Sequence, residues 1–365
     1  MKEYELKIFN EKNLKKVYSE YLLGIDVGGT YTNIGVAGLE KNKPVLLFSL
    51  NFESQKLNSL IQVINKTLTY AKTNYNIDIS FACIGAAGVI SPKNDFAKLT
   101  KLPWDVDLKE ILQETPLKKA FIINDFQAIG YAINLLDKNN KNDLIEIRLG
   151  EISNQNCETK VVIGAGTGLG KSILYFDKKY NSYIPKASEG GHADFPVENN
   201  SELELLDFIK NFRKIQKPII YEELISGRGL ESIYLFLRKN REYDETKYTK
   251  EIDESLSKAP LISKYKSMDT TCKETFNLFT KYFARCARNF VLDTMATGGL
   301  YIAGGIASKN KEIFNSKEFI DEFEKSFKRD FVLKKVPIYV IINYDVSLLG
   351  TCYACSLLFN KNMRC

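Results

Sequence analysis

Short apolar runs alternate along the chain with longer segments whose apolar residues recur at helical spacing. The short runs are typical of buried strands and lie at residues 21–25, 34–39, 45–52, 81–85, 120–123, 160–163, 172–176, 300–302 and 338–342. The segments with helical spacing predict helices at 57–75, 126–137, 271–294, 311–328 and from 347 onward. Because strands and helices alternate, the pattern predicts an α/β fold.

Two segments repeat one pattern: an apolar strand, a glycine-rich turn and a second apolar strand. They are YLLGIDVGGTYTNIGVA at 21–37 and KVVIGAGTGLGKSILYF at 160–176. They lie about 140 residues apart, which is the length of one domain. The length of 365 residues also suggests two domains. Two similar domains, each offering a glycine hairpin to one ligand, would account for the repeat.

Composition narrows the class of protein. The chain has 44% hydrophobic and 26% charged residues, which is typical of a soluble globular protein. Its charge of +6, from 51 Lys and Arg against 45 Asp and Glu, is mild and spread along the chain, so it neither excludes nor predicts a nucleic-acid partner, and we expect none. A single histidine, His192, removes most multi-histidine metal sites. Seven scattered cysteines indicate reduced, buried thiols.

Residues 1–20 form a polar leader with five lysines and four glutamates, unlike a secretory or transit signal. An amphipathic helix and a solvated tail both remain open for this leader. The most apolar segment, 347–359, is too short to cross a bilayer. We therefore expect no membrane association and a cytoplasmic location.

Both glycine turns are candidates for binding phosphate, because glycine lets backbone N–H groups approach it closely. Residues 165–172 nearly match a P-loop, but a P-loop must open a helix, and 173–176 alternate like a strand. A P-loop that uses Lys171 would require a helix after Ser172, so we prefer a pair of phosphate-binding hairpins. In the first hairpin, Asp26 can hold Mg²⁺ through water. The residues expected to face phosphate are Gly28, Gly29, Thr30, Gly166, Thr167 and Gly168.

Seven ordered blocks resemble the bacterial-type glucokinases of the hexokinase–actin–chaperone ATPase superfamily. Between residues 22 and 351 they are LLGIDVGGTYTNIGVA, FIINDFQAIGYAI, VVIGAGTGLG, SEGGHADFPVEN, EELISGRGLESIY, LYIAGGI and LLGT. The resemblance implies a two-domain actin-like (ribonuclease H-like) fold with a ligand cleft between the domains. The small domain would be 1–135 plus 345–365, and the large domain 136–344. The implied reaction is ATP-dependent phosphorylation of D-glucose at its 6-hydroxyl, feeding glycolysis, and relatives suggest a homodimer.

The resemblance also assigns residues to the sugar. It makes Asp125 the general base for the 6-hydroxyl proton, whereas the residue types alone indicate a helix N-cap at Asn124 and Asp125. It places sugar hydroxyls on Asn124, Glu189 and His192, and a carboxylate and an imidazole can together accept and donate such hydrogen bonds.

Two further assignments come from the resemblance. Glu222 would bind the sugar from a helix that ends at Gly227, with Glu223 as the competing candidate. The adenosine would lie against Gly304 and Gly305, which stand between a predicted strand and a predicted helix.

One position departs from the resemblance. Relatives usually carry asparagine where this chain has Lys101, which leaves the choice of sugar open. A kinase of mannose, glucosamine or an N-acetylhexosamine is therefore an alternative, and a non-catalytic actin-like ATP-binding protein is another. No structural zinc is expected, because no cysteine follows Glu189 before Cys272, and Cys352 with Cys355 is the only close pair.

Overall fold

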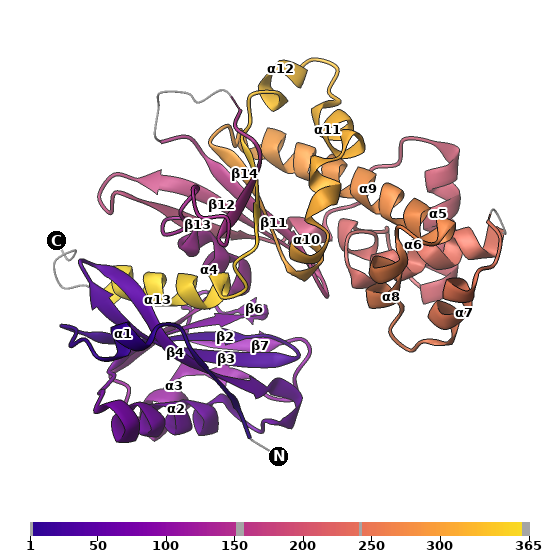
Figure 1. Cartoon of the computed structure of the whole chain (residues 1–365). Coiled ribbons are helices and arrows are strands. Elements are labelled where there is room, and N and C mark those ends of the chain that lie inside the picture. Colours follow the sequence, from indigo (N-terminus) through magenta and orange to yellow (C-terminus); the bar gives the residue numbers. More distant parts are fainter. Residues whose placement is uncertain (1–2, 151–156, 241–242, 360–365) are drawn as a thin grey trace. The chain divides into compact units, whose positions relative to one another are not determined.

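The structure is a computed structural model that describes residues 3–150, 157–240 and 243–359, and it divides into two compact units. Unit 1 holds the described residues of Met1–Asp137, Phe176–Ala187 and Asn343–Cys365. Unit 2 holds those of Lys138–Tyr175 and Ser188–Ile342. Strands and helices alternate along the chain (Figure 1), which confirms the predicted α/β class.

Unit 1 contains a six-stranded sheet in the order β1-β4-β3-β2-β5-β9. Its strands are β1 (Glu5–Ile8), β2 (Tyr21–Val27), β3 (Tyr31–Glu40), β4 (Lys43–Glu53), β5 (Phe81–Ala86) and β9 (Lys119–Asn124). The strands β2, β3 and β4 pair antiparallel, whereas β2, β5 and β9 run parallel. A small sheet beside it holds β6 (Gly88–Ile90), β7 (Phe96–Leu99) and β8 (Val106–Asp107).

The helices of unit 1 pack on its six-stranded sheet. They are α1 (Glu11–Leu14), α2 (Leu60–Tyr75), α3 (Leu108–Glu114), α4 (Asp125–Ala132) and α13 (Val346–Phe359). The helix α13 lies on β2 and β5 and against α4. Gly350 permits this contact, because a Cβ there would lie 1.7 Å from the Ala128 carbonyl oxygen. The last helix of the chain therefore belongs to the core of the first unit.

In the part that the structure describes, residues 3–20, the polar leader is neither one amphipathic helix nor a solvated tail. Its residues Glu5–Ile8 form β1, which pairs antiparallel with β4 at the edge of the sheet. All four residues of β1 are exposed. Because the strand has no buried face, its sequence does not need to alternate apolar and polar residues, and the pattern did not predict it.

The second six-stranded sheet has the order β10-β15-β14-β11-β12-β13. Its strands are β10 (Leu144–Arg148), β11 (Lys160–Ala165), β12 (Leu169–Asp177), β13 (Ser182–Ser188), β14 (Gly299–Ala303) and β15 (Ile338–Ile341). The strands β11 and β12 form an antiparallel hairpin, and β11, β14 and β15 run parallel. Because Lys171 and Ser172 lie within β12, the P-loop alternative is wrong.

The remaining helices belong to unit 2. They are α5 (Asn200–Arg213), α6 (Gly227–Asn240), α7 (Lys247–Glu254), α8 (Lys258–Tyr265), α9 (Thr270–Thr294), α10 (Gly305–Lys309), α11 (Lys317–Glu324) and α12 (Asp330–Leu333). The helix predicted at 311–328 is divided into a 3₁₀ turn at Lys311–Asn315 and α11. Ser316 causes the break, since its extended backbone and side chain cap α11 through the Phe319 N–H.

The two sheets share one topology. The order β4-β3-β2-β5-β9 corresponds to β13-β12-β11-β14-β15, with a glycine hairpin after the first strand and two parallel strands beside it. The carboxyl ends of the parallel strands therefore meet beside a glycine turn in each unit, where ligands of open α/β sheets bind.

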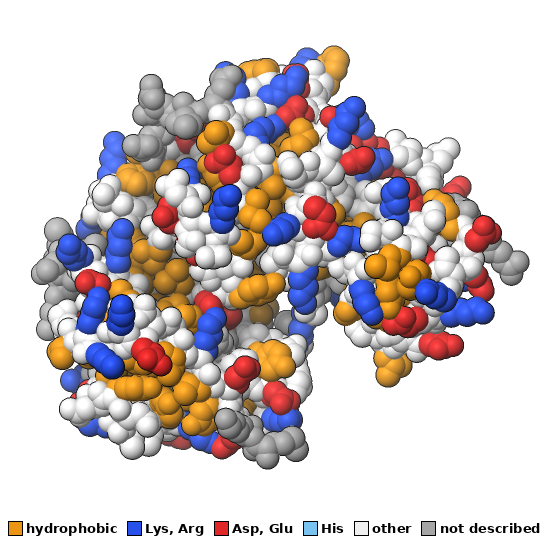
Figure 2. Space-filling view, viewed as in Figure 1, with side chains coloured by type: hydrophobic (Ala, Val, Ile, Leu, Met, Phe, Trp, Pro, Cys, Tyr) orange, Lys and Arg blue, Asp and Glu red, His pale blue; other side chains and the backbone are white. Residues whose placement is uncertain are grey.

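Three further features are the surface charge, the character of the helices and the state of the cysteines. On the face shown in Figure 2, lysine and arginine side chains are interspersed with aspartate and glutamate rather than gathered in one patch. Among the described residues, no helix combines the length and apolar character needed to cross a membrane. Five of the six described cysteines are buried and free as predicted, but Cys157 is exposed.

Candidate active site

The first glycine hairpin joins β2 to β3 in unit 1. The Gly28 N–H donates to the Tyr31 carbonyl oxygen (3.0 Å), so this amide is used within the turn rather than presented to phosphate. Ser54 fixes the turn, because its hydroxyl donates to the Gly28 carbonyl (2.7 Å) and its N–H to the Thr30 carbonyl (2.9 Å). The Gly29 and Thr30 amides remain as the candidates for binding phosphate.

Asp26 lies at the carboxyl end of β2, just before this turn. Burial raises the pKa of its carboxyl to about 6, and the nearby Ser347 hydroxyl acts in the opposite direction without cancelling the effect. No lysine or arginine contributes to this shift. A desolvated carboxylate without a cation fits a Mg²⁺ that is held mainly by phosphate and water. Within the described chain, no three His, Cys, Asp or Glu side chains form a metal-binding group of their own.

Asn124 and Asp125 lie where β9 meets α4. The Asn124 side-chain oxygen accepts from the N–H groups of Phe126 (2.9 Å) and Gln127 (3.3 Å), and the Gln127 side chain accepts from the Asn124 N–H (3.1 Å). This is a capping box, so the N-cap expected from the residue types is present. The cap occupies the amide oxygen of Asn124 and leaves its NH₂ group as the donor for a ligand. Asp125 follows in the first turn of α4, half-buried at the same end of the sheet.

The second glycine hairpin joins β11 to β12. The Gly166 N–H donates to the Gly168 carbonyl (2.8 Å), and the Gly166 carbonyl accepts from the Gly227 N–H (2.9 Å). The Thr167 and Gly168 amides are thus the candidates here. A Cβ on Gly304 would lie 2.5 Å from the Ala165 carbonyl oxygen, so the turn assigned to adenosine adjoins the end of β11. Gly304 has φ +94°, a conformation that favours glycine.

Glu222 is not in a helix that ends at Gly227. It lies in a 3₁₀ turn, Tyr221–Glu223, and α6 begins at Gly227. The cause is Ser226, whose hydroxyl accepts from the Gly229 N–H (3.1 Å) at the start of α6. Ser226, a typical N-cap residue directly before Gly227 and the apolar helical pattern that follows, was the signal in the sequence that would have placed this boundary correctly.

The carboxylate of Glu222 holds three groups together. Its Oε2 accepts from the Leu169 N–H (2.9 Å) and lies 3.9 Å from His192 Nε2, and its Oε1 accepts from Arg228 (2.9 Å). Glu223 shares Arg228 (3.4 Å) but is buried, and its other carboxylate oxygen faces Arg213 (3.8 Å). The geometry therefore separates the two candidates: Glu222 lies with the second hairpin and His192, and Glu223 does not.

The segment Glu189–His192 packs on the same hairpin. Residues Gly190–His192 form a 3₁₀ turn, and the His192 N–H donates to the Glu189 carbonyl (2.9 Å). A Cβ on Gly191 would lie 2.1 Å from the Leu169 carbonyl oxygen, so only glycine allows this approach. The side chains of Glu189 and His192 are exposed, as a site open to a hydrophilic ligand requires.

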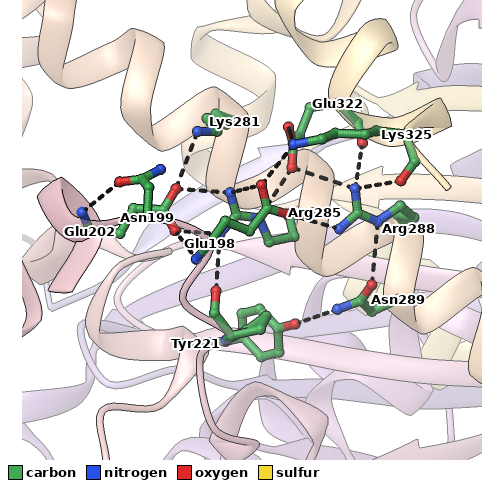
Figure 3. A network of polar contacts seen from close by, with 11 residues as sticks. Glu198, Asn199, Glu202, Tyr221, Lys281, Arg285, Arg288, Asn289, Glu322 and Lys325 are labelled. Atoms are coloured by element: carbon green, nitrogen blue, oxygen red, sulfur yellow. Dashed lines mark hydrogen bonds and ion pairs between the residues drawn. The ribbon is translucent and has the colours of Figure 1, made fainter. Parts of the chain in front are cut away.

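A buried ionic network, which the sequence did not reveal, supports this segment within unit 2 (Figure 3). The fully buried Arg285 donates to Glu202 (2.8 and 2.9 Å), Glu322 (3.1 Å) and the Pro196 carbonyl (2.9 Å). Burial alone would raise the pKa of Glu202, but hydrogen bonds from Arg285 and other donors lower it to about 2. The network thereby ties the chain just after His192 to α5, α9 and α11.

Two sheets of shared topology, each with a glycine hairpin at the carboxyl ends of its parallel strands, are the arrangement of an actin-like fold. The glucokinase family model matches residues 22–357, and the chain belongs to this family.

Individual relatives agree with this family. The chain is 32% identical over 344 residues to the glucokinase of Nostoc punctiforme, covering 90% of this chain and 97% of that protein. Its fold is similar to the crystal structure of Balamuthia mandrillaris glucokinase in complex with glucose (TM-score 0.78, 21% identity, 92% of this chain and 93% of the other). It is also similar to a ROK family glucokinase from Streptomyces griseus in complex with glucose and AMPPNP (TM-score 0.60, 17% identity, 92% and 99%).

Proposed function

We propose that this protein is a glucokinase that transfers the terminal phosphoryl group of ATP to the 6-hydroxyl of D-glucose. The observation that carries the proposal is the family match over residues 22–357, which spans every residue assigned above to sugar or nucleotide. The complexes of relatives with glucose and with AMPPNP support the same two substrates.

In this proposal the sugar is held by side chains of different chemistry. The NH₂ group of Asn124 donates to a hydroxyl, since its oxygen is used in the cap. Glu222 accepts from hydroxyls while the Leu169 N–H and Arg228 fix its orientation. Glu189 and His192 complete the set. Asp125 accepts the proton of the 6-hydroxyl as its oxygen attacks phosphorus, because phosphoryl transfer needs positioning and a modest proton acceptor.

The nucleotide is assigned to the glycine turns. The Gly29 and Thr30 amides of the first hairpin and the Thr167 and Gly168 amides of the second would donate to phosphate oxygens. Gly304 and Gly305 would lie against the adenosine. Asp26 would hold Mg²⁺ through water, and Mg²⁺ when bound neutralises charge on the terminal phosphates.

A coupled ADP-release assay with MgATP and a panel of hexoses tests the proposal. We expect glucose to be turned over, and Asp125→Asn to lower kcat about 10²- to 10⁴-fold while glucose still binds. The control is Asp207→Asn, which alters an exposed carboxylate on α5 and should leave kcat unchanged. Turnover of mannose, glucosamine or an N-acetylhexosamine in preference to glucose would reassign the substrate. ATP turnover that no hexose stimulates would favour the non-catalytic actin-like alternative. The cytoplasmic location, the role in glycolysis and the homodimer stay predictions.

A further inference from the structure

Lys101 lies against the first glycine hairpin. It belongs to the segment between β7 and β8 in unit 1, and its side chain is exposed. A Cβ built on Gly29 would lie 3.2 Å from Lys101 Cδ and 3.3 Å from its Cβ, so the aliphatic stem of the lysine covers this glycine. Among the described residues, no carboxylate forms an ion pair with the Lys101 ammonium. The stem of a cationic side chain therefore lies beside the turn, and its ammonium has no ion-pair partner in the described part of the chain.

Two contacts hold the Lys101 segment to the hairpin. The Gln55 NH₂ group donates to the carbonyl oxygens of both Gly29 and Lys101, each at 3.0 Å. The Trp104 indole N–H donates to the Ser54 carbonyl (3.5 Å), and Ser54 in turn fixes the turn itself. Because the backbone of Lys101 is tied to that of Gly29, the base of the lysine side chain stays beside the turn.

We propose that Lys101 binds the terminal phosphates of the nucleotide through its ammonium group. The proposal rests on the first hairpin being part of the nucleotide site, as in the proposed function. A lysine is a compact cation on a flexible stem, which suits it to phosphate oxygens. The lysine that stands here in place of the asparagine of relatives thus changes how the nucleotide phosphates are bound, and the affinity for glucose does not depend on Lys101.

The chain provides a probe for this proposal, because Trp104 is its only tryptophan and lies in the same segment. Titrations with AMPPNP, ADP and AMP in the presence of Mg²⁺ would be followed by Trp104 fluorescence and by calorimetry. For Lys101→Met we expect about tenfold weaker binding of AMPPNP, a smaller loss for ADP and none for AMP. Lys101→Arg should retain most of the affinity. The control is Lys98→Met, which removes the same charge from an exposed position on β7 and should bind all three nucleotides normally.

The double variant Gln55→Met with Lys101→Met tests whether the tether positions the lysine. If it does, Gln55→Met weakens AMPPNP binding in the presence of Lys101 and has little further effect in its absence. Equal AMPPNP affinity in the native protein and Lys101→Met would overturn the proposal, as would an equal loss in Lys98→Met. A raised KM for glucose with unchanged nucleotide binding would move Lys101 to the sugar. Lack of hexose phosphorylation by the native protein would refute the proposed function alone, since the nucleotide titrations do not require turnover.

Discussion

At Gly168 in the second hairpin, adding a single methyl group tests the orientation of the Glu222 side chain with only a small effect on the stability of the hairpin. A Cβ there would lie 2.5 Å from Glu222 Oε2 and 3.2 Å from its Cδ. The φ of Gly168 lies outside the left-handed region, so alanine brings no backbone strain. The atom that must give way is the end of a flexible side chain. We therefore expect Gly168→Ala to fold and to displace the Glu222 carboxylate.

The size of the effect follows from these distances. An ordinary contact requires about 3.4 Å, so the carboxylate must retreat by roughly 0.9 Å, which breaks its 2.9 Å hydrogen bond from the Leu169 N–H. The free energy of unfolding should fall by about 1 kcal/mol, since the group is partly solvated. A displaced charged acceptor costs the sugar about 1.5–3 kcal/mol, which is about 10- to 150-fold in kcat/KM for glucose.

The matched control is Gly166→Ala in the same turn, where an added Cβ has no neighbour within 4 Å. Glucose dissociation constants from calorimetry, kinetic constants and thermal unfolding would be compared for both variants. Only Gly168→Ala should weaken glucose binding. Gly166→Ala should leave it unchanged, although its Cβ enters the space assigned to phosphate and should raise the KM for ATP. Glucose binding within twofold of the native value in Gly168→Ala would refute the role of Glu222.

Two further predictions concern buried charges. Burial raises the pKa of Asp26 from 3.8 to about 6, so the folded state binds this proton more tightly, and its stability contribution is lost as the pH rises from about 4 through 6. Asp26→Asn should therefore stabilise the ligand-free protein by about 3 kcal/mol at pH 8 and hardly at all at pH 4, and a pH-independent difference in Tm would contradict this. Arg285→Met removes the fully buried cation that Glu202 and Glu322 share, leaves them Lys281 and Arg288, and should cost about 3–5 kcal/mol in urea unfolding. A loss below 1 kcal/mol would show that the network contributes no net stability.

The strands that begin the two hairpins were predictable because they are almost completely buried and therefore read as continuous apolar runs. The apolar runs at 21–25 and 160–163 became β2 and β11, and their glycine turns became the hairpins. The strand β1 was not predictable, since its residues are exposed and its pairing with β4 depends on a distant segment. The local pattern of apolar and polar residues indicates which side chains are buried, and an exposed edge strand buries none of its side chains.

The candidate site was predictable to a similar extent. Motifs indicated the residue types at Asn124, Asp125 and Glu222, because their chemistry is tied to short local sequences. The surroundings of Glu222 were not visible, since Leu169 and Arg228 reach it only through the fold. The network around Arg285 joins residues more than 80 positions apart, and no local spacing marks them.

The same strand–turn–strand unit is therefore used twice with different charge around it. In unit 1 the aliphatic stem of Lys101 covers the turn and Gln55 ties the lysine to it, and the nearby carboxylate, Asp26, is half-buried. In unit 2 the turn carries the carboxylate of Glu222 on its Leu169 N–H. The carboxylate at the second turn can accept from hydroxyl donors, whereas the first turn has a lysine beside it that can attract phosphate. The repeat thus explains the topology, and the side chains added to each copy distinguish the two turns. In the proposed function both turns face phosphate, and only the second also carries a carboxylate, Glu222, that can accept from sugar hydroxyls.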